Sequence, residues 1–274
     1  MGQINFIRYP GGKQRLLDYF LQYLPSSNEI KGKYIEPFVG GGSVFFSINP
    51  KKAILSDINN ELIELYKGIR YAPRQIWKLY SQFPSTKEGY YYIRDEYNCS
   101  KLIPKAARIL FLNRTCFKGM WRHNSKGKFN IGYGGQDRRW VINEDDLREV
   151  SLRLKEVELI CSDFQVIIDN SKKNDFIFLD PPYKPNEIEC KNEHYTYGLF
   201  TFENHKRLAN SLKEASKRGV KWALTTSSHA KILELFHSEE IIEFPIGTGS
   251  KPGILSKESG EVLVMNYKEK EFDN

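Results

Sequence analysis

The chain has 274 residues, of which 40% are hydrophobic and 14% aromatic, so a disordered protein is excluded and a substantial core can form. Lys and Arg number 41 against 34 Asp and Glu, which gives a net charge of +7 and permits a polyanionic partner without proving one. Four scattered cysteines without a CxxC pair, and histidines without ligand spacing, argue against a zinc site and fit a reducing cytosol. We expect a soluble, cytoplasmic protein, because we find neither a signal-peptide core nor a membrane span of ~20 apolar residues.

Apolar runs rich in β-branched residues alternate along the chain with stretches of helical periodicity. We predict strands at residues 34–38, 53–55, 157–161, 176–179, 221–225, 241–244 and 262–265. We predict helices at residues 13–23, 59–69, 164–168 and 202–218, the last with Thr201 as its N-cap and Gly219 at its end. Strands that alternate with helices indicate an α/β fold with a Rossmann-like, doubly wound, mostly parallel sheet.

The alternation breaks between residues 70 and 156. Helical pieces at 73–80, 90–98 and 105–113 precede a loop at 116–135 that is rich in Gly, Asn and Lys. From Lys101 to Arg139 there are ten Lys and Arg residues and one acid, Asp137, which favours a phosphate-facing surface over an evenly solvated one. We read 70–156 as a mainly helical recognition lobe inserted into a catalytic domain made of 1–69 and 157–274. The polar residues 268–274 are expected to fray.

Two glycine-containing segments lie near predicted helix starts. Residues 8–13, Arg-Tyr-Pro-Gly-Gly-Lys, place a donor-rich Gly pair before a helix, which can hold an anionic group, although Gly-Gly-Lys is common by chance. Residues 36–43, Glu-Pro-Phe-Val-Gly-Gly-Gly-Ser, read as a strand end, a glycine loop and a helix start. Gly40 and Gly42 match the dinucleotide pattern but Phe45 takes the third position, so a nucleoside-like ligand is favoured over a pyrophosphate. The alternative is a tight turn.

Three acidic residues each follow a predicted strand. Asp57 ends the strand after the glycine loop, where an acid commonly accepts ribose hydroxyls, although it could instead cap the next helix. Asp163 ends another strand, and a contact to an adenine amino group or a cap for the helix at 164–168 are both open. Asp180 begins Asp-Pro-Pro-Tyr, which places a carboxylate, a backbone carbonyl and the Tyr183 ring where open α/β sheets bind ligands. That set suits a planar amino group such as that of a nucleobase, and its alternative is a Pro-rich turn.

Together these segments resemble the Dam-type DNA adenine-N6 methyltransferases, the D12 class or alpha group of amino-methyltransferases. The resemblance rests on residues 8–13, 36–43 and 180–183, and on Ser-Asp-Ile-Asn at 56–59. In the lobe it rests on Phe-Leu-Asn-Arg-Thr-Cys-Phe-Lys-Gly-Met-Trp-Arg-His-Asn at 111–124 and on Gly-Lys-Phe-Asn at 127–130. The motifs run in alpha-group order and span residues 8 to about 267, almost the whole chain.

The resemblance implies S-adenosyl-L-methionine as the cofactor. By motif position, the implied cofactor-binding residues are Tyr9, Lys13, Glu36, Phe38, Gly40, Gly42, Asp57, Asp163 and Asp180. Asp57 would bind the ribose hydroxyls and Asp163 the adenine end. The family usually opens with Lys-Trp-Ala-Gly-Gly-Lys, so Arg8 and Tyr9 keep one cation and one aromatic ring. An aromatic ring near a sulfonium can contribute about 0.5–2 kcal/mol.

The implied catalytic residues are Asp180, Pro181, Pro182 and Tyr183. The lone pair of adenine N6 is delocalised into the ring, which makes the nitrogen a poor nucleophile. If Asp180 and the Pro181 carbonyl accept both N6 hydrogens, the nitrogen can pyramidalise while Tyr183 stacks on the base. The methyl transfer is an in-line displacement that depends on positioning and preorganised electrostatics and needs no metal.

The implied partner is double-stranded DNA, from which the target base must be flipped. By motif position the DNA contacts are Arg8, Arg114, Phe117, Lys118, Met120, Arg122, Asn124, Lys126 and Lys128. Phe117 and Lys118 take the positions at the extruded base's site, where Asn is more usual than Lys. Met120, where Leu is commoner, and Arg122 take base-reading positions, and Arg can grip guanine O6 and N7. The contacts expected on phosphates are Arg114, Lys126 and Lys128.

We therefore expect site-specific adenine-N6 methylation of duplex DNA by a monomer or weak dimer. GATC is the expected target because the lobe resembles Dam. The alternatives are another adenine target, or methylation of cytosine N4, RNA adenine or a protein glutamine amide, against which the basic lobe argues. A catalytically silent DNA-binding protein is disfavoured by the complete motifs, and a nicotinamide oxidoreductase by the missing third glycine and by Asp-Pro-Pro-Tyr.

Overall fold

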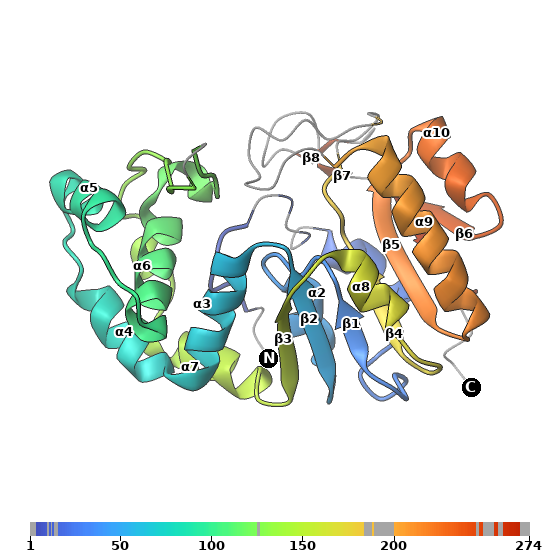
Figure 1. Cartoon of the computed structure of the whole chain (residues 1–274), viewed down its shortest axis with the longest axis horizontal. Helices are drawn as coiled ribbons and strands as arrows, with labels where there is room; N and C mark the ends of the chain where they lie inside the picture. The colour runs from blue at the N-terminus through green and yellow to red at the C-terminus, as the bar shows by residue number, and fades with distance from the viewer. Residues whose placement is uncertain are drawn as a thin grey trace.

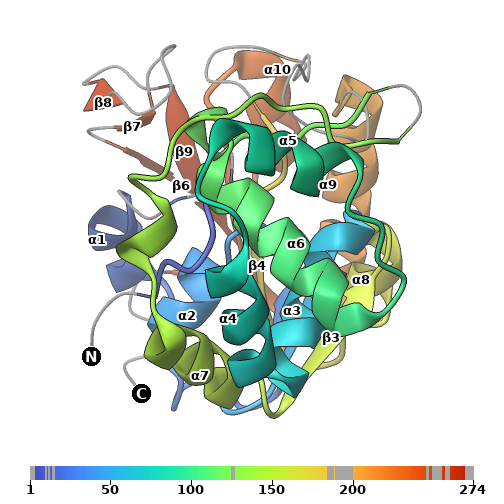
Figure 2. The ribbon, with the colours of Figure 1, turned by 90° about the vertical axis from the view of Figure 1, so that its left-hand side faces the viewer.

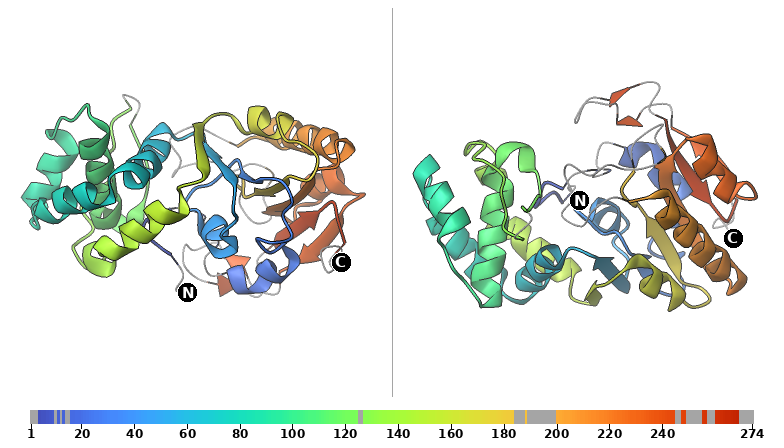
Figure 3. Two further views of the ribbon diagram at one scale, coloured as in Figure 1. Left: turned by 90° about the horizontal axis from the view of Figure 1, so that it is seen from below. Right: turned by 45° about the horizontal axis from the view of Figure 1, so that its top comes forward.

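A seven-stranded sheet forms the centre of the protein, with helices on both faces and a further group of helices beyond one edge (Figure 1). The computed structural model describes residues 4–268 apart from 10, 12, 14–15, 125–126, 184–187, 189–199, 245–246, 249–254 and 257–259. Figure 3 shows the helical group and the sheet side by side from below. Residues 269–274, which belong to the tail predicted to fray, lie outside the described residues.

The sheet is mostly parallel, which confirms the predicted fold class. Its order is β3 (Val157–Cys161), β2 (Ala53–Asp57), β1 (Tyr34–Glu36), β4 (Phe176–Leu179), β5 (Lys221–Ser227), β9 (Glu261–Met265) and β6 (Glu240–Glu243). The first five strands are parallel, and β9 runs antiparallel between β5 and β6. The strand predicted at 34–38 ends at Glu36, because Pro37 has no N–H to donate to a ladder. A separate two-stranded pair, which the sequence did not predict, joins β7 (Gly247–Thr248) to β8 (Leu255–Ser256).

Helices cover both faces of the sheet, which explains why its central strands β1, β4 and β5 are buried almost throughout. One face carries α1 (Leu17–Phe20), η2 (Leu21–Tyr23) and α2 (Ser43–Ile48), and the other α8 (Phe164–Asp169), α9 (Phe202–Lys217), α10 (Ala230–Leu233) and η5 (Glu234–Phe236). In β4, Phe178 stacks on Phe20 of α1 with ring centroids 5.8 Å apart. Its neighbours Ile177 and Leu179 belong to the core on the opposite face.

The helical group is built around one buried helix. Its members are α4 (Pro73–Gln82), α5 (Lys87–Asp95), α6 (Leu102–Thr115), η3 (Phe117–Gly119), η4 (Arg139–Val141) and α7 (Glu144–Arg153). Figure 2 shows α6 at the centre of this group. Helix α3 (Asn60–Tyr71), which follows β2, packs against both α6 and α7. A single hydrophobic core therefore runs from one face of the sheet through α3 into the helical group.

The predicted helices differ from the observed ones mainly at their ends. α5 begins at Lys87 rather than at residue 90, because the Thr86 side chain accepts a hydrogen bond from the Gly89 amide. α7 was not predicted, although Asn143 and Asp146 form a capping box at its start. Thr201 caps α9 as predicted. Of the helix predicted at 13–23, residues 17–23 form α1 and η2. No helix in the described part of the chain is long and apolar enough to cross a membrane.

Candidate active site

Four carboxylates lie at the C-terminal edge of the sheet, the upper edge in Figure 1. Glu36 and Asp57 are the last residues of β1 and β2, and Asp180 directly follows β4. Asp163 lies two residues after β3 and immediately before α8. They share one edge because these strands are parallel, so the sheet brings together acids that are far apart in the sequence.

Asp180 makes two polar contacts that fix its carboxylate. Lys13 Nζ lies 2.8 Å from Asp180 Oδ1, and Thr225 Oγ1 donates to the same oxygen at 2.7 Å. Lys13 is 4% exposed, and it also donates to the Gly11 carbonyl at 3.1 Å. Burial raises the pKa of Asp180, whereas Lys13 and Thr225 act to lower it. The pair therefore keeps a partly buried carboxylate in place at the end of β4.

The aromatic ring of Tyr183 borders the same pair. Lys13 Nζ lies 4.8 Å from the Tyr183 ring centroid, and the Tyr183 hydroxyl donates to Glu261 Oε1 at 3.1 Å. Glu261, the first residue of the reversed strand β9, is buried. Burial raises the pKa of the Tyr183 phenol well above its ordinary value, and the Glu261 carboxylate raises it further. Tyr183 therefore stays a neutral ring with a fixed plane.

Glu36 is buried below the glycine loop. The Tyr34 hydroxyl donates to Glu36 Oε2 at 2.7 Å. Burial raises the pKa of Glu36 well above its ordinary range, and the nearby carboxylates of Asp180 and Asp57 raise it as well. The resemblance implied a position for Glu36 on the glycine-loop side of the cofactor. In the structure Glu36 is buried on β1, between β2, which ends at Asp57, and β4, which precedes Asp180.

Asp57 holds the glycine loop by two backbone hydrogen bonds. The amide of Gly40 donates to Asp57 Oδ2 at 3.2 Å, and the amide of Asn59 donates to Oδ1 at 2.9 Å. Burial raises the pKa of Asp57 to about 6, against the lowering effect of these amides. Asn59, rather than Asp57, is the N-cap of α3, because its side chain accepts from the amide of Leu62. The capping alternative for Asp57 is thus wrong.

Two positions of the glycine loop, Gly40 and Gly42, have no room for a side chain. Gly40 and Gly42 have φ angles of 46° and 68°, in the left-handed region. A Cβ on Gly42 would lie 2.7 Å from the Tyr66 hydroxyl, and one on Gly40 would lie 3.0 Å from the ring of Tyr9. The loop therefore lies directly against Tyr9, which comes from the segment 8–13.

Phe38 and Asp163 lie on the α8 side of the edge. The Phe38 ring stacks on Phe164 of α8 with centroids 5.3 Å apart. Asp163 caps α8 by accepting from the Gln165 amide at 2.9 Å and also pairs with Arg207 at 2.8 Å. The predicted cap is confirmed, and the remaining role of Asp163, at the adenine end of a cofactor, stays a prediction.

Arg8 joins the sheet to the loop that follows α6. The Asn113 side chain accepts from the Arg8 amide at 2.8 Å and donates to the Arg8 carbonyl at 2.6 Å. The Arg8 side chain lies over Gly119, where a Cβ would approach it to 2.5 Å. One residue further, the Tyr9 ring lies 5.5 Å from that of Trp121. Residues 8 and 9 thus contact both the glycine loop and the predicted DNA-reading loop.

The predicted DNA-reading residues are unequally exposed. Phe117 and Lys118 are exposed at η3, where Lys118 has a positive φ of 54°. Met120 packs against the core and Arg122 is half-buried, whereas Asn124 and Lys128 are exposed on the following hairpin. Lys126 lies outside the described residues.

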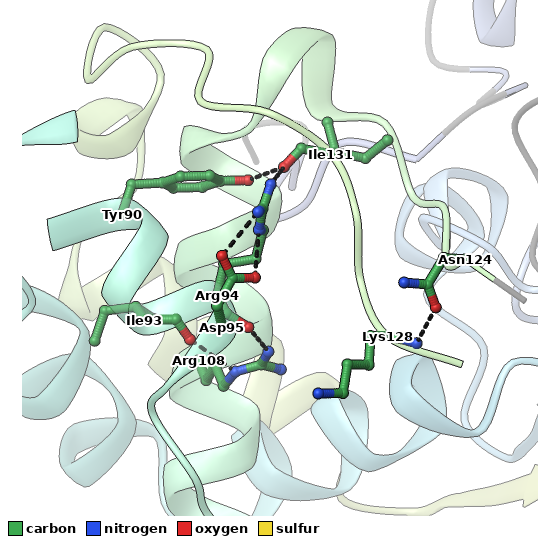
Figure 4. Close-up of polar contacts among 8 residues, drawn as sticks. All are labelled: Tyr90, Ile93, Arg94, Asp95, Arg108, Asn124, Lys128 and Ile131. Carbon is green, nitrogen blue, oxygen red and sulfur yellow. Dashed lines mark hydrogen bonds and ion pairs between the residues drawn. The ribbon is translucent and has the colours of Figure 1, made fainter. Parts of the chain in front are cut away.

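Three arginines of the basic stretch bind the protein's own backbone. Arg114 is 2% exposed and donates to the Arg138 carbonyl, and burial lowers the pKa of its guanidinium. Arg108 donates to the carbonyls of Ile93 and Arg94 (Figure 4), and buried Arg139 donates to the carbonyls that end α4. The phosphate contact predicted for Arg114 does not fit this buried position. The basic excess between residues 101 and 139 is therefore partly structural.

Several residues of the site gave no sign in the sequence. Thr225 reads as part of an apolar strand, and Glu261 as the start of another. Asn113 lies within a helix, so only the fold reveals that it binds the Arg8 peptide. Because buried polar groups are usually hydrogen-bonded, Asn113 and Thr225 could have been recognised from the sequence as residues that need a partner. The sequence does not show which residues those partners are.

The residues present fit a nucleoside-bearing methyl donor. A Cβ at Gly40 or Gly42 would crowd the glycine loop, Asp57 is a buried acceptor beside the loop, and Phe38 gives an aromatic wall. Beside them stand Asp180 and Tyr183, fixed by Lys13, Thr225 and Glu261. Within the described residues no cluster of three or more possible metal ligands occurs. Fold and site together define the class as a Rossmann-like methyltransferase of amino groups.

The comparison with known families narrows this class. The chain belongs to the D12 class N6 adenine-specific DNA methyltransferases, whose family model matches residues 9–244. It is 35% identical to a type II methyltransferase of Methanocaldococcus jannaschii, over 96% of this chain and 98% of that protein. It is 30% identical to a type II methyltransferase of Lactococcus lactis subsp. cremoris, over 96% and 95% of the two chains. It is 32% identical to a DNA adenine methylase of Haemophilus influenzae, over 77% of this chain and 75% of that protein.

Proposed function

We propose that this DNA adenine-N6 methyltransferase uses S-adenosyl-L-methionine to methylate a flipped adenine in duplex DNA, with Asp180 and Tyr183 holding the base. The observation that carries the proposal is the fixed geometry of Asp180, with Lys13 and Thr225 both on Oδ1. Because both described contacts of the carboxylate use that oxygen, we assign Oδ2 to an N6 hydrogen of the substrate. The second N6 hydrogen is assigned to the Pro181 carbonyl.

The reaction needs a nitrogen lone pair that points away from the ring. Two acceptors on the N6 hydrogens favour a pyramidal nitrogen, and Tyr183 fixes the plane of the base. The cofactor supplies an activated methyl group on a sulfonium when it is bound. As the N–C bond forms and the C–S bond breaks, N6 becomes positive and releases one hydrogen as a proton. The raised pKa of Asp180 suits it as the first acceptor of that proton.

Cofactor binding is assigned to the glycine-loop side of the edge. Asp57 is the acceptor for the ribose hydroxyls, and Tyr9, Lys13 and Phe38 border the cofactor. Asp163 already caps α8 and pairs with Arg207, and both of these contacts use Oδ1. A hydrogen bond from the adenine end of the cofactor would therefore use Oδ2.

DNA binding is assigned to the helical group, and residues 70–156 are proposed as the recognition domain. Phe117 and Lys118 would enter the duplex where the base leaves it, because η3 presents both side chains to solvent. Met120 and Arg122 would read bases, and Arg8, whose side chain lies against Gly119, would contact DNA beside them. Lys128 would contact a phosphate.

The activity is tested with Asp180→Ala and a tritiated methyl donor. We expect loss of turnover on adenine-containing duplexes, with the dissociation constant for DNA within about threefold of wild type, because phosphate contacts supply most of the affinity for DNA. Asp169→Ala makes the same substitution at the exposed last residue of α8, so it is the matched control and should keep turnover. Retained turnover in Asp180→Ala would refute the role of Asp180.

GATC is the proposed target, and a type II modification enzyme with another adenine target is the second candidate. Two relatives are named as type II methyltransferases and one as a DNA adenine methylase, and none of these names states a target sequence. Methylation-sensitive sequencing of DNA from cells that express the protein decides between them. Modified adenines confined to GATC support the first candidate, and any other motif supports the second.

A further inference from the structure

Residues 122–124 and 127–130 pair with each other as a small antiparallel hairpin. His123 and Phe129 form an isolated antiparallel bridge, and their rings meet edge to face with centroids 5.8 Å apart. Phe129 is buried, and the His123 side chain is 5% exposed. Arg122 and Asn130 flank this pair, and Arg122 Nε donates to Asn130 Oδ1 at 3.1 Å. Because side chains alternate along a strand, the inward orientation of His123 and Phe129 determines where Arg122 and Asn130 point.

His123 contacts Glu61 of α3, the helix that follows strand β2. Its Nε2 lies 2.7 Å from Glu61 Oε2, in the first turn of α3. Glu61 follows Asp57 by four residues and Asn59 by two, so its position is fixed by the same turn that holds the glycine loop. The hairpin is thus joined directly to the part of the protein assigned to the cofactor.

The far end of the hairpin is held by α5. The Tyr90 hydroxyl and Arg94 Nη1 both donate to the Ile131 carbonyl, at 2.8 and 3.1 Å (Figure 4). At the turn, the Asn124 side chain accepts from the amide of Lys128 at 3.1 Å, which closes the loop on itself. The His123–Glu61 contact therefore supplies the attachment of the first strand, and the Ile131 clamp that of the second.

We propose that His123 and Glu61 are positioning residues for sequence specificity, acting through the hairpin that carries Arg122. The inference rests on the proposed function, because it concerns how Arg122 meets a base. An arginine fork discriminates guanine by two parallel hydrogen bonds, and this depends on its angle and distance. Loss of the attachment lets the hairpin tilt, so that contacts to the correct base weaken while phosphate contacts, which carry no sequence information, persist.

The test compares His123→Ala and Glu61→Ala with wild type on two duplexes. The first duplex carries the methylation site found by sequencing, and the second differs from it at one base pair outside the target adenine. We expect the ratio of kcat/KM between the duplexes to fall roughly tenfold in each variant. KM for the correct duplex should rise while single-turnover kcat at saturating DNA stays within about twofold. The double variant should lose no more than either single variant, because both residues act through one contact.

Two further variants separate positioning from general stability. Glu64 lies one turn after Glu61 on α3 and contacts Lys105 of α6, not the hairpin. Glu64→Ala therefore removes a contact between α3 and α6 only. It should keep the wild-type ratio. Glu61→Gln keeps an oxygen that can accept from His123 and should recover most of the ratio. An unchanged ratio in folded His123→Ala and Glu61→Ala, an equal loss in Glu64→Ala, or additive losses in the double variant would overturn the proposal. Absence of methyl transfer by wild type would instead overturn the proposed function.

Discussion

At the scale of single residues, the contact between Lys13 and Asp180 is the most consequential in the site. The two side chains meet at 2.8 Å, and both are largely shielded from water. Burial alone would raise the pKa of Asp180, and Lys13 opposes that effect. The cation thus keeps the carboxylate able to accept hydrogens from an amino group.

Lys13→Met should therefore move the acid limb of the rate–pH profile to higher pH. Without the cation the pKa of Asp180 rises further, so the acceptor form is lost at a higher pH than in wild type. Below that pKa the single-turnover rate should fall about tenfold per pH unit, at saturating cofactor. Lys33→Met, which removes an exposed ion pair with Glu158, is the control and should keep the wild-type profile. An unchanged acid limb in Lys13→Met would contradict the account.

Asp57 should make cofactor binding depend on pH near 6. Its pKa is raised to about 6, so below that pH the carboxylate gains a proton and loses acceptor capacity for two ribose hydroxyls. Calorimetric titration should show affinity that falls as the pH drops through about 6 and is level above about 7. Asp57→Asn should bind more weakly and remove this dependence. Equal dependence in the variant would assign the titration to another group.

At the scale of elements, the glycine loop between β1 and α2 is constrained by both its conformation and its packing. Gly42→Ala would strain a backbone with φ of 68° and bring a Cβ to 2.7 Å from the Tyr66 hydroxyl. Gly127→Ala has a similar φ of 71° but meets nothing within 4 Å. Urea unfolding should show a loss of about 1 kcal/mol in Gly127→Ala, and of about 2–4 kcal/mol in Gly42→Ala. Equal losses would mean that packing contributes nothing.

The sequence predicted the strands better than the helix ends for a physical reason. Strands buried on both faces, such as β4, give unbroken apolar runs that few other structures produce. Helix ends depend on local caps, such as Thr86 before α5 and the Asn143 box before α7, whose residues also occur in turns. Three acids of the site were predictable because they end strands. Thr225, the partner of Asp180, and Glu261, the partner of Tyr183, were not predictable, because they come from strands whose order in the sheet, with β9 reversed, no local pattern encodes.

At the scale of the whole molecule, the basic stretch divides into buried and exposed side chains. Arg139 is fully buried and binds the carbonyls of Tyr80 and Phe83, whereas Lys128 is exposed on the hairpin. Arg139→Met should lower the free energy of unfolding by about 2–4 kcal/mol, because buried carbonyls lose their donor. Lys128→Met should leave stability unchanged and reduce the salt dependence of DNA binding by about 0.9 in the log–log slope. A lower salt slope in folded Arg139→Met would contradict this division.

The joining of sheet and helical group through α3 gives the molecule its functional geometry. The C-terminal edge of the sheet and the loop after α6 lie at the same upper end of the molecule in Figure 1. The charge count permits a polyanionic partner, but the fold determines which basic side chains would be available to it.

The identity of the methylated base tests the central claim most directly. Duplex DNA is incubated with the protein and labelled S-adenosyl-L-methionine, digested to nucleosides, and separated with mass detection. The account predicts N6-methyladenine as the labelled nucleoside, with its formation abolished in Asp180→Ala. Label in N4-methylcytosine, or N6-methyladenine formed equally well by Asp180→Ala, would contradict it.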